Sequence, residues 1–241
     1  MPLAIIHEDD DLLVVVKAQG MLVHPTRGVK SGTLLNALVY HLNRDLIQRA
    51  NFEVALRPGL VHRLDKATSG LMVIAKNQRA LSILSRHFHL RLVEKKYTAL
   101  VRGCVATDEM LINEPIGRQE EGWPKWRVLK TGKAAETHLR VIERRELSTL
   151  LELEPRTGRT NQLRIHCSAV GHPIVGDDIY GDGEASSPRL CLHAAHLAFH
   201  HPANGEWLEF NSEPRKRSFL PRLRIKSLWI SLVFNSVFLC G

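Results

Sequence analysis

One carboxylate stands alone in a stretch that is otherwise basic, small or apolar. In GLVHRLDKATSGLMVIAKN, residues 59–77, Asp65 lies between Arg63 and Lys66, and an apolar run follows Gly70. The cationic neighbours favour the ionised form of the acid, so we expect a carboxylate at neutral pH. An ionised carboxylate can act as a nucleophile, a general base or a metal ligand.

The same stretch permits other roles for Asp65. Aspartate beside small residues often accepts hydrogen bonds from backbone amides, so Asp65 could instead cap a turn near Thr68. A hydrolase that pairs Asp65 with a nearby histidine such as His62 is a further alternative. Glycosidases and aspartic proteases usually need two cooperating carboxylates, and only Asp65 stands in so distinctive a motif. These residues alone leave the alternatives open.

The chain as a whole is basic. Lys and Arg number 33 against 25 for Asp and Glu, which gives a formal charge of +8. A basic surface attracts polyanions, so nucleic acid is the expected class of partner, although the solvated faces of ordinary proteins also carry such charge. The sequence does not identify any protein partners, which stay unknown.

Three further segments combine basic, amide and aromatic side chains that can contact nucleic acid. They are EKKYTALVRG with Tyr97, RQEEGWPKWRVLKTGK with Lys125 and Trp126, and PRTGRTNQLRIH with Arg159, Asn161 and Arg164. Trp126 could stack on bases while Lys125 contacts phosphates, and a solvated loop is the alternative for this segment. Tyr97 could equally be an ordinary strand residue, and Arg164 could pair with a surface acid such as Glu154.

The cysteines and histidines do not form a metal-binding pattern. The cysteines are scattered without a C-x-x-C pair, at Cys104, Cys167, Cys191 and Cys240. This spacing argues against a zinc site and a disulfide framework, and it fits a reducing compartment. Histidines gather at positions 193, 196, 200 and 201, but His193 and His196 point to opposite faces of the expected strand. We therefore expect no metal.

Hydrophobic periodicity predicts the elements that position these residues. Apolar or alternating runs predict strands within residues 11–17, 97–101, 137–143 and 149–155. Helical spacing predicts a helix within the segment 32–48, where Thr33 is the N-cap. It predicts a second helix over 78–92, with Leu81, Leu84, Phe88 and Leu92 on one stripe. A third helix is expected between an N-cap at Thr160 and a C-terminal stop at Gly171. Strands interrupted by few helices, without strict alternation, predict an α+β fold with a mixed, largely antiparallel sheet and flanking helices.

We expect one domain over residues 1–214 and a tail of uncertain structure over residues 215–241. The tail begins basic and is apolar from 227 to 240. This apolar stretch is shorter than the ~20 residues of a membrane-spanning helix, so we expect no stable membrane association. The alternatives for the tail are a covered strand, a non-native extension and a membrane-surface anchor. Acidic residues at the N-terminus, where a secretory signal needs basic ones, indicate a cytoplasmic protein.

Read in order, segments spread over residues 3–214 resemble the RluA-type pseudouridine synthase family. They are HRLDKATSGLMVIAKN, EKKYTALVRG, PRTGRTNQLRIH, GHPIVGDDIYG and LHAAHLAFHHPANGE. The resemblance implies that family's catalytic fold and the conversion of uridine in RNA to pseudouridine, in which uracil is detached from C1′, turned and rejoined through C5. Because the isomerisation involves no redox change and gains or loses no group, no cofactor is implied.

The resemblance also implies roles for particular residues. Asp65 would be the catalytic aspartate, Tyr97 the aromatic residue against the target base, and Arg164 the guanidinium paired with Asp65. Arg63 would take the place of the extruded nucleotide. The other expected RNA contacts are His62, Arg159, Asn161, Lys125 and Trp126. Residue types leave open whether Asp65 attacks C1′, adds to the ring or removes a proton.

Two positions depart from the residues usual in that family. Asn161 stands where His is usual, and Ala18 follows Lys17 where Pro is usual. Asn161 keeps its hydrogen-bonding capacity but carries no charge, which affects local orientation or RNA contacts. Many relatives also carry an N-terminal RNA-binding domain of the S4 type, whose residues are absent here. We therefore expect substrate selection to rest on the catalytic domain, unless the sequence is a piece of a longer chain.

The leading hypothesis is a pseudouridine synthase that acts on structured RNA. Large-subunit ribosomal RNA is the first candidate substrate and transfer RNA is the second. The alternative from another functional class is a non-catalytic RNA-binding or ribosome-assembly factor built on the same fold.

Overall fold

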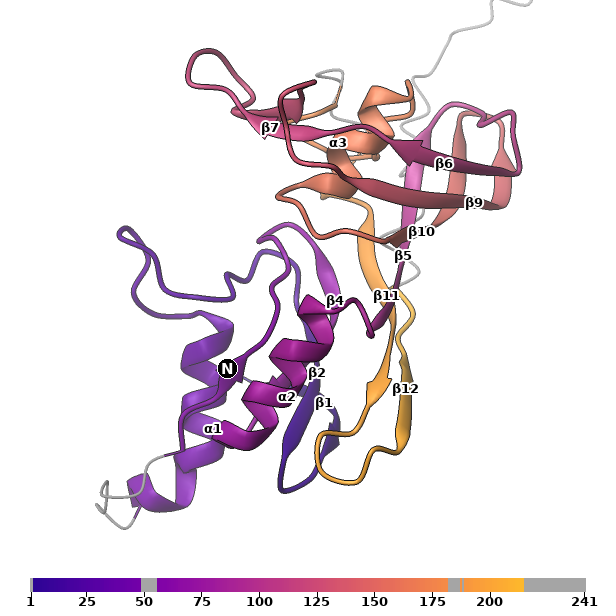
Figure 1. The fold of residues 1–241 in the computed structure, drawn as a ribbon. Helices are drawn as coiled ribbons and strands as arrows, with labels where there is room; N and C mark the ends of the chain where they lie inside the picture. Colours follow the sequence, from indigo (N-terminus) through magenta and orange to yellow (C-terminus); the bar gives the residue numbers. More distant parts are fainter. Residues whose placement is uncertain (1, 49–55, 182–186, 188, 215–241) are drawn as a thin grey trace, which may run out of the picture.

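The structure of the chain is a computed structural model that describes residues 2–48, 56–181, 187 and 189–214 (Figure 1). The expected tail over residues 215–241 lies outside the described residues. None of the described helices is long and apolar enough to cross a membrane.

Most strands join one large sheet. The elements are β1 (Ala4–Glu8), β2 (Leu12–Lys17), α1 (Leu34–Gln48), β3 (Gly59–Leu60), β4 (Ser69–Ala75), α2 (Gln78–His89), β5 (Glu94–Arg102), β6 (Glu109–Asn113), β7 (Ile116–Arg118), β8 (Trp126–Val128), β9 (Glu136–Arg145), β10 (Ser148–Pro155), α3 (Gln162–Ala169), β11 (Leu192–His200) and β12 (Trp207–Asn211). Ten strands form a sheet in the order β1-β2-β4-β11-β5-β10-β9-β6, with β12 paired to β11 and β3 to β4.

The sheet is mixed because one central pair is parallel. β4 and β11 run in the same direction, and the other paired strands of the sheet are antiparallel. The short β7 and β8 form a separate antiparallel hairpin. The predicted α+β class with a mixed, largely antiparallel sheet is confirmed.

The strands β2 and β4 are buried on both faces. Alternate residues of a strand point to opposite sides, so Leu12 and Val14 pack toward Leu84 of α2, whereas Leu13 and Val15 pack toward α1. The other end of the sheet is covered by α3, through Leu163 and Cys167 among other residues. Figure 1 shows the resulting division, with α1 and α2 near β2 and β4, and α3 near β8 and β10.

Helix boundaries follow the predicted capping chemistry in part. Thr33 caps the start of α1 as predicted. Its hydroxyl accepts the backbone N–H of Asn36 at 3.3 Å, and the side-chain Oδ1 of Asn36 accepts the backbone N–H of Thr33 at 3.1 Å. The helix α2 ends before Leu92, which is 51% exposed and does not belong to the buried stripe. The chain turns away there through Arg91, whose φ of 60° is left-handed.

The start of α3 differs from the prediction. The N-cap is Asn161 rather than Thr160, and its φ of 54° places it in the left-handed region. Asparagine tolerates this conformation better than the β-branched threonine, which explains the shift by one residue. Gly171, with a φ of 85°, follows the end of the helix as predicted.

Candidate active site

One cavity of about 730 Å³ collects side chains from four separate segments of the chain. Its lining includes seven of the predicted site residues: His62, Arg63, Asp65, Tyr97, Arg159, Asn161 and Arg164. They come from the loop before β4, from β5, and from the turn and first helical residues of α3. Additional basic side chains, Arg91, Lys95 and Arg156, also line the cavity, so its walls favour an anionic ligand.

Asp65 sits in a tight turn that leaves its carboxylate free. The backbone carbonyl of Asp65 accepts the Thr68 N–H at 3.1 Å, and Leu64 beside it is only 5% exposed. Within the described part of the chain, the side-chain oxygens of Asp65 make no hydrogen bond or ion pair. The turn is therefore closed by the backbone, and the alternative in which the carboxylate caps it is wrong.

Tyr97 reaches the same cavity from the middle of the sheet. It pairs with Ala194 of β11, and Ala194 pairs in turn with Gly70 of β4, close to Asp65 in sequence. Gly70 is required at this crossing, because its φ is +123° and a Cβ atom would lie 2.3 Å from the Ala194 carbonyl oxygen. Burial and the nearby charge of Asp65 raise the pKa of Tyr97, so the phenol keeps its proton at neutral pH.

Arg164 is held by acids that sequence reasoning did not assign. Its Nε and Nη2 donate to Asp177 at 2.7 and 2.5 Å, and Nη2 also donates to Asp178 at 3.1 Å. The predicted pair with Asp65 is therefore replaced by a bidentate pair with Asp177, and Glu154 is not the partner either. Burial acts to lower the pKa of Arg164, but Asp177, aided by the charges of Asp65 and Asp178, outweighs it and raises that pKa.

A signal for Asp177 was available in the sequence. Two consecutive acids follow Gly176 in GHPIVGDDIYG, and a short glycine turn beside paired acids suggests a partner for a distant cation. Sequence spacing does not say which of the many arginines that cation is. The tertiary structure decides it by placing this turn against α3.

Lys17 is a second residue that sequence reasoning did not place at the site. Its side chain is 1% exposed and donates to the carbonyls of Ala18 and Met21 at 2.9 Å and of Lys66 at 3.4 Å. Burial lowers the pKa of Lys17 to about 8, and the charge of Asp65 opposes that effect. Lys17 thus fixes the backbone beside the loop that carries Asp65.

His62 has a structural environment. Its ring stacks on Phe88 with centroids 4.5 Å apart, and its Nε2 accepts the Val73 N–H at 3.1 Å. Burial, with a contribution from the charge of Lys95, lowers the pKa of His62 to about 3, so the ring is neutral at neutral pH. With Nε2 already occupied by Val73, this nitrogen is not free to act as a base beside Asp65, and the hydrolase alternative loses support.

Besides His62, three other predicted RNA contacts line the cavity, and they differ in how their side chains are held. Arg63 is exposed. Arg159 donates from Nε to the Ala134 carbonyl at 3.0 Å, and Asn161 donates to the Tyr180 hydroxyl at 3.1 Å. Asn161 therefore orients Tyr180, which is a local role rather than a charged contact.

Lys125 and Trp126 do not line the cavity. Trp126 lies on β8 and packs beside Ile116, Ala135 and Ile165, so its ring belongs to a small core. The Lys125 ammonium donates to the Glu120 carbonyl. The interpretation of Trp126 as a base-stacking side chain needs correction; the exposed tryptophan of this hairpin is Trp123, at 70%.

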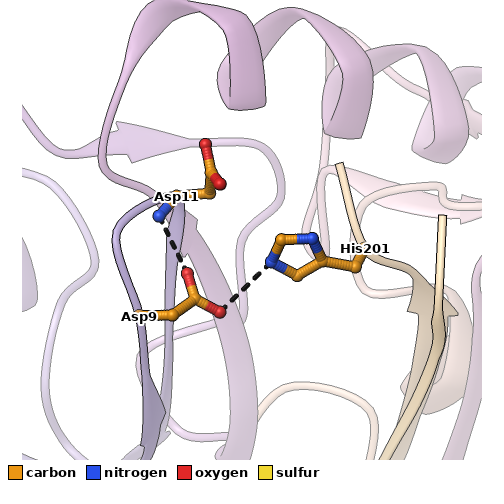
Figure 2. Close-up of side chains that lie close together, drawn as sticks. All are labelled: Asp9, Asp11 and His201. Carbon is orange, nitrogen blue, oxygen red and sulfur yellow. Dashed lines mark hydrogen bonds and ion pairs between the residues drawn. The ribbon is translucent and has the colours of Figure 1, made fainter. Parts of the chain in front are cut away.

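One group of potential metal ligands lies in the described residues, away from the cavity. Figure 2 shows Asp9, Asp11 and His201, whose candidate ligand atoms lie within 4.8 Å of one another. Asp9 already accepts the N–H groups of Asp11 and Leu12 at 2.8 Å and contacts the His201 ring at 3.2 Å. These bonds tie the turn after β1 to the turn after β11.

The family model for RNA pseudouridylate synthase matches residues 11–169. The chain belongs to the RNA pseudouridylate synthase family. It is therefore an RNA pseudouridine synthase, an isomerase that acts on RNA.

Individual relatives agree with the family match. The chain is 45% identical to an uncharacterized RNA pseudouridine synthase of Aquifex aeolicus, over 88% of this chain and 70% of the relative. It is 40% identical to the ribosomal large subunit pseudouridine synthase D of Pseudomonas aeruginosa, over 90% of this chain and 70% of the relative. Among solved structures, human RNA pseudouridylate synthase domain containing 1 superimposes with a TM-score of 0.73 at 31% identity, covering 88% of this chain and 84% of the other.

Proposed function

We propose that this synthase isomerises a specific uridine in structured RNA, and that the RNA is large-subunit ribosomal RNA. The observation that carries the proposal is the meeting of Asp65, Tyr97 and Arg164 in one cationic cavity. The name of the Pseudomonas aeruginosa relative favours the ribosomal substrate. Transfer RNA is the second candidate.

The reaction needs the target nucleotide to leave its stack, because its reacting atoms are covered within folded RNA. Unstacking and unpairing cost a few kcal/mol, and contacts in the enzyme must offset that cost. The exposed Arg63 would fill the vacated position, and the partly buried Tyr97 would pack against the uracil in the cavity. The basic side chains around the cavity would hold the flanking phosphates.

Asp65 would perform the chemistry as an ionised carboxylate. The bond between N1 and C1′ breaks, the uracil turns, and a bond between C5 and C1′ forms. The hydrogen on C5 leaves to solvent while N1 takes up a proton, so the composition of the RNA is unchanged. A free carboxylate beside a fixed guanidinium suits either nucleophilic attack or proton removal.

Release of tritium from RNA that carries 5-tritiated uridine tests the activity. We expect wild-type protein to release tritium without free uracil, Asp65→Asn to lose the release while its RNA affinity stays within a few fold, and Asp108→Asn to match wild type. Asp108 is a suitable control because its side chain is 85% exposed and pairs with Arg144, outside the cavity. Turnover by Asp65→Asn would refute the catalytic assignment.

The same assay separates the alternatives. A non-catalytic binding factor would bind RNA and release no tritium, and a hydrolase would release free uracil. Ribosomal and transfer RNA purified from cells that lack the gene, offered separately, identify the substrate class. We also propose that residues 1–214 suffice for turnover and that the protein works in the cytoplasm; removal of residues 215–241 and cell fractionation test these two statements.

A further inference from the structure

Within the described residues, the guanidinium of Arg164 donates hydrogen bonds from Nε and Nη2 only. Nε and Nη2 donate to the two oxygens of Asp177, in a geometry that fixes the plane of the group. The side chains of Arg164 and Asp177 are 5% and 0% exposed. Among the described residues, Nη1 has no hydrogen-bond partner, so it is the nitrogen left for Asp65 or for the substrate.

Asp177 is itself fixed by its own turn. Its Oδ1 accepts the N–H groups of Ile179 and Tyr180 at 3.0 and 2.9 Å. The turn depends on Gly176, whose φ is +77° and where a Cβ atom would lie 1.9 Å from the Arg189 carbonyl oxygen. Asp177 is thus an anchor that the fold has already immobilised.

Tyr180 supports the same guanidinium from its face. The Arg164 Cζ lies 5.3 Å from the centre of the Tyr180 ring, and the hydroxyl of that ring accepts from Asn161 at 3.1 Å. Ser168 of α3 donates to the Tyr180 carbonyl at 2.8 Å. Residues that precede α3 in the chain and residues that follow it therefore restrain the Arg164 cation at the cavity wall.

We propose that Asp177 is a positioning residue for the isomerisation, which holds one edge of Arg164 so that Nη1 is presented to Asp65 and the everted nucleotide. This inference rests on the proposed function. Because Arg164 is secured by Asp177, its charge acts on the cavity while Asp65 stays free of a direct ion pair. A cation fixed before the substrate arrives needs no reorganisation during the reaction.

Asp177 and Asp178 give a matched comparison, since both contact Nη2 but the side chain of Asp178 is 84% exposed. We expect Asp177→Asn to lower kcat by about 10- to 100-fold while the Kd for RNA changes less than about threefold, as for a misplacement of about 1 Å. We expect Asp178→Asn to lower kcat by less than about threefold. Thermal melts establish the temperature at which each variant is folded, and kcat is compared there.

A double-mutant cycle with Arg164→Lys separates positioning from a merely structural role. If Asp177 acts through Arg164, Asp177→Asn should lower kcat by less than about threefold in the Arg164→Lys background. The same loss in both backgrounds, or a folded Asp177→Asn protein with wild-type kcat, would overturn the inference. If Asp177→Asn does not fold, Asp177→Glu replaces it in the cycle, with the same criterion.

The two proposals fail in distinguishable ways. Loss of the proposed function appears as tritium release that survives Asp65→Asn or never occurs with wild-type protein. Loss of the positioning role appears as wild-type activity that requires Asp65 but not Asp177.

Discussion

The loop before β4 and the first turn of α3 face one cavity but treat their charges differently. On the α3 side, the Arg164 cation is bound by Asp177 and Asp178. On the β4 side, the loop is secured by contacts to its backbone and to His62, and the Asp65 carboxylate has no such partner among the described residues. The Asp65 carboxylate, which we propose as the reactive group, is left free, whereas the Arg164 cation, which we propose orients it, is held by two acids.

This difference indicates that the free-energy cost of burying and orienting Arg164 is offset during folding. Burying Arg164 without a partner would cost several kcal/mol, and the bidentate pair offsets that cost during folding. A paired Asp65 would have to break an ion pair before reacting. For the proposed reaction, this arrangement would keep the carboxylate available and would remove the need to orient the cation during the reaction.

Among variants that leave Asp65 in place, the largest effect should follow from changing Arg164. Arg164→Lys keeps the charge but cannot reproduce the two parallel hydrogen bonds to Asp177, so we expect kcat to fall on the order of 100-fold. Steady-state tritium release at saturating RNA measures it. Arg159→Lys is the control, because the Arg159 side chain lines the cavity and its only hydrogen bond within the described residues goes to the Ala134 carbonyl. This variant should raise KM a few fold. Equal losses from both variants would contradict the special restraint on Arg164.

Lys17 tests whether the β4 side is held through its backbone. Lys17→Met removes the ammonium that donates to the backbone carbonyls of Ala18, Met21 and Lys66, and we expect a loss of about 1–3 kcal/mol in the free energy of unfolding. Urea denaturation measures this loss. Because the hydrogen bonds of the Lys17 ammonium within the described residues all go to backbone carbonyls, kcat of the folded variant should fall less than that of Arg164→Lys. The reverse order would show that the loop is not restrained in this way.

Lys17 also carries a pH signature. Its pKa is lowered to about 8 in the folded protein, below the 10.5 of the free group, so between these values the unfolded chain binds more protons. The contribution of Lys17 to the free energy of unfolding should therefore rise with pH across this window, by about 1 kcal/mol per pH unit. The difference in stability between wild type and Lys17→Met, measured at pH 7.5 and 9.5, isolates it.

The smallest effect concerns His62. His62→Phe keeps the stack on Phe88 but leaves the Val73 N–H unpaired, and we expect a loss of about 1–2 kcal/mol at pH 7.5. Since the pKa of His62 is lowered to about 3 from 6.5, the native protein loses stability as pH falls from 6.5 toward 3. Urea midpoints at pH 7.5 and 5 should show less acid sensitivity in the variant. Unchanged acid sensitivity would contradict the buried, neutral ring.

Local chemistry predicted several elements well. The apolar run of residues 11–17 and the alternation in 149–155 became β2 and β10, because burial on both faces or on one face leaves a direct trace in the sequence. Thr33 was recognisable as a cap because its hydrogen-bond partner, Asn36, lies three positions along the chain. The predicted extension of α2 to Leu92 was wrong, because the chain makes a left-handed turn at Arg91 on its way into β5.

By itself, the sequence determined the family motifs, the α+β class, the basic character and the isolated carboxylate of Asp65, because each is written in residues that are near neighbours along the chain. Only the tertiary structure decided which acid binds Arg164, that Lys17 supports the loop of Asp65, and that Trp126 packs in a core. These contacts join residues from different elements. Their partners are selected by packing and by the need to satisfy buried polar groups, which spacing in the sequence does not encode.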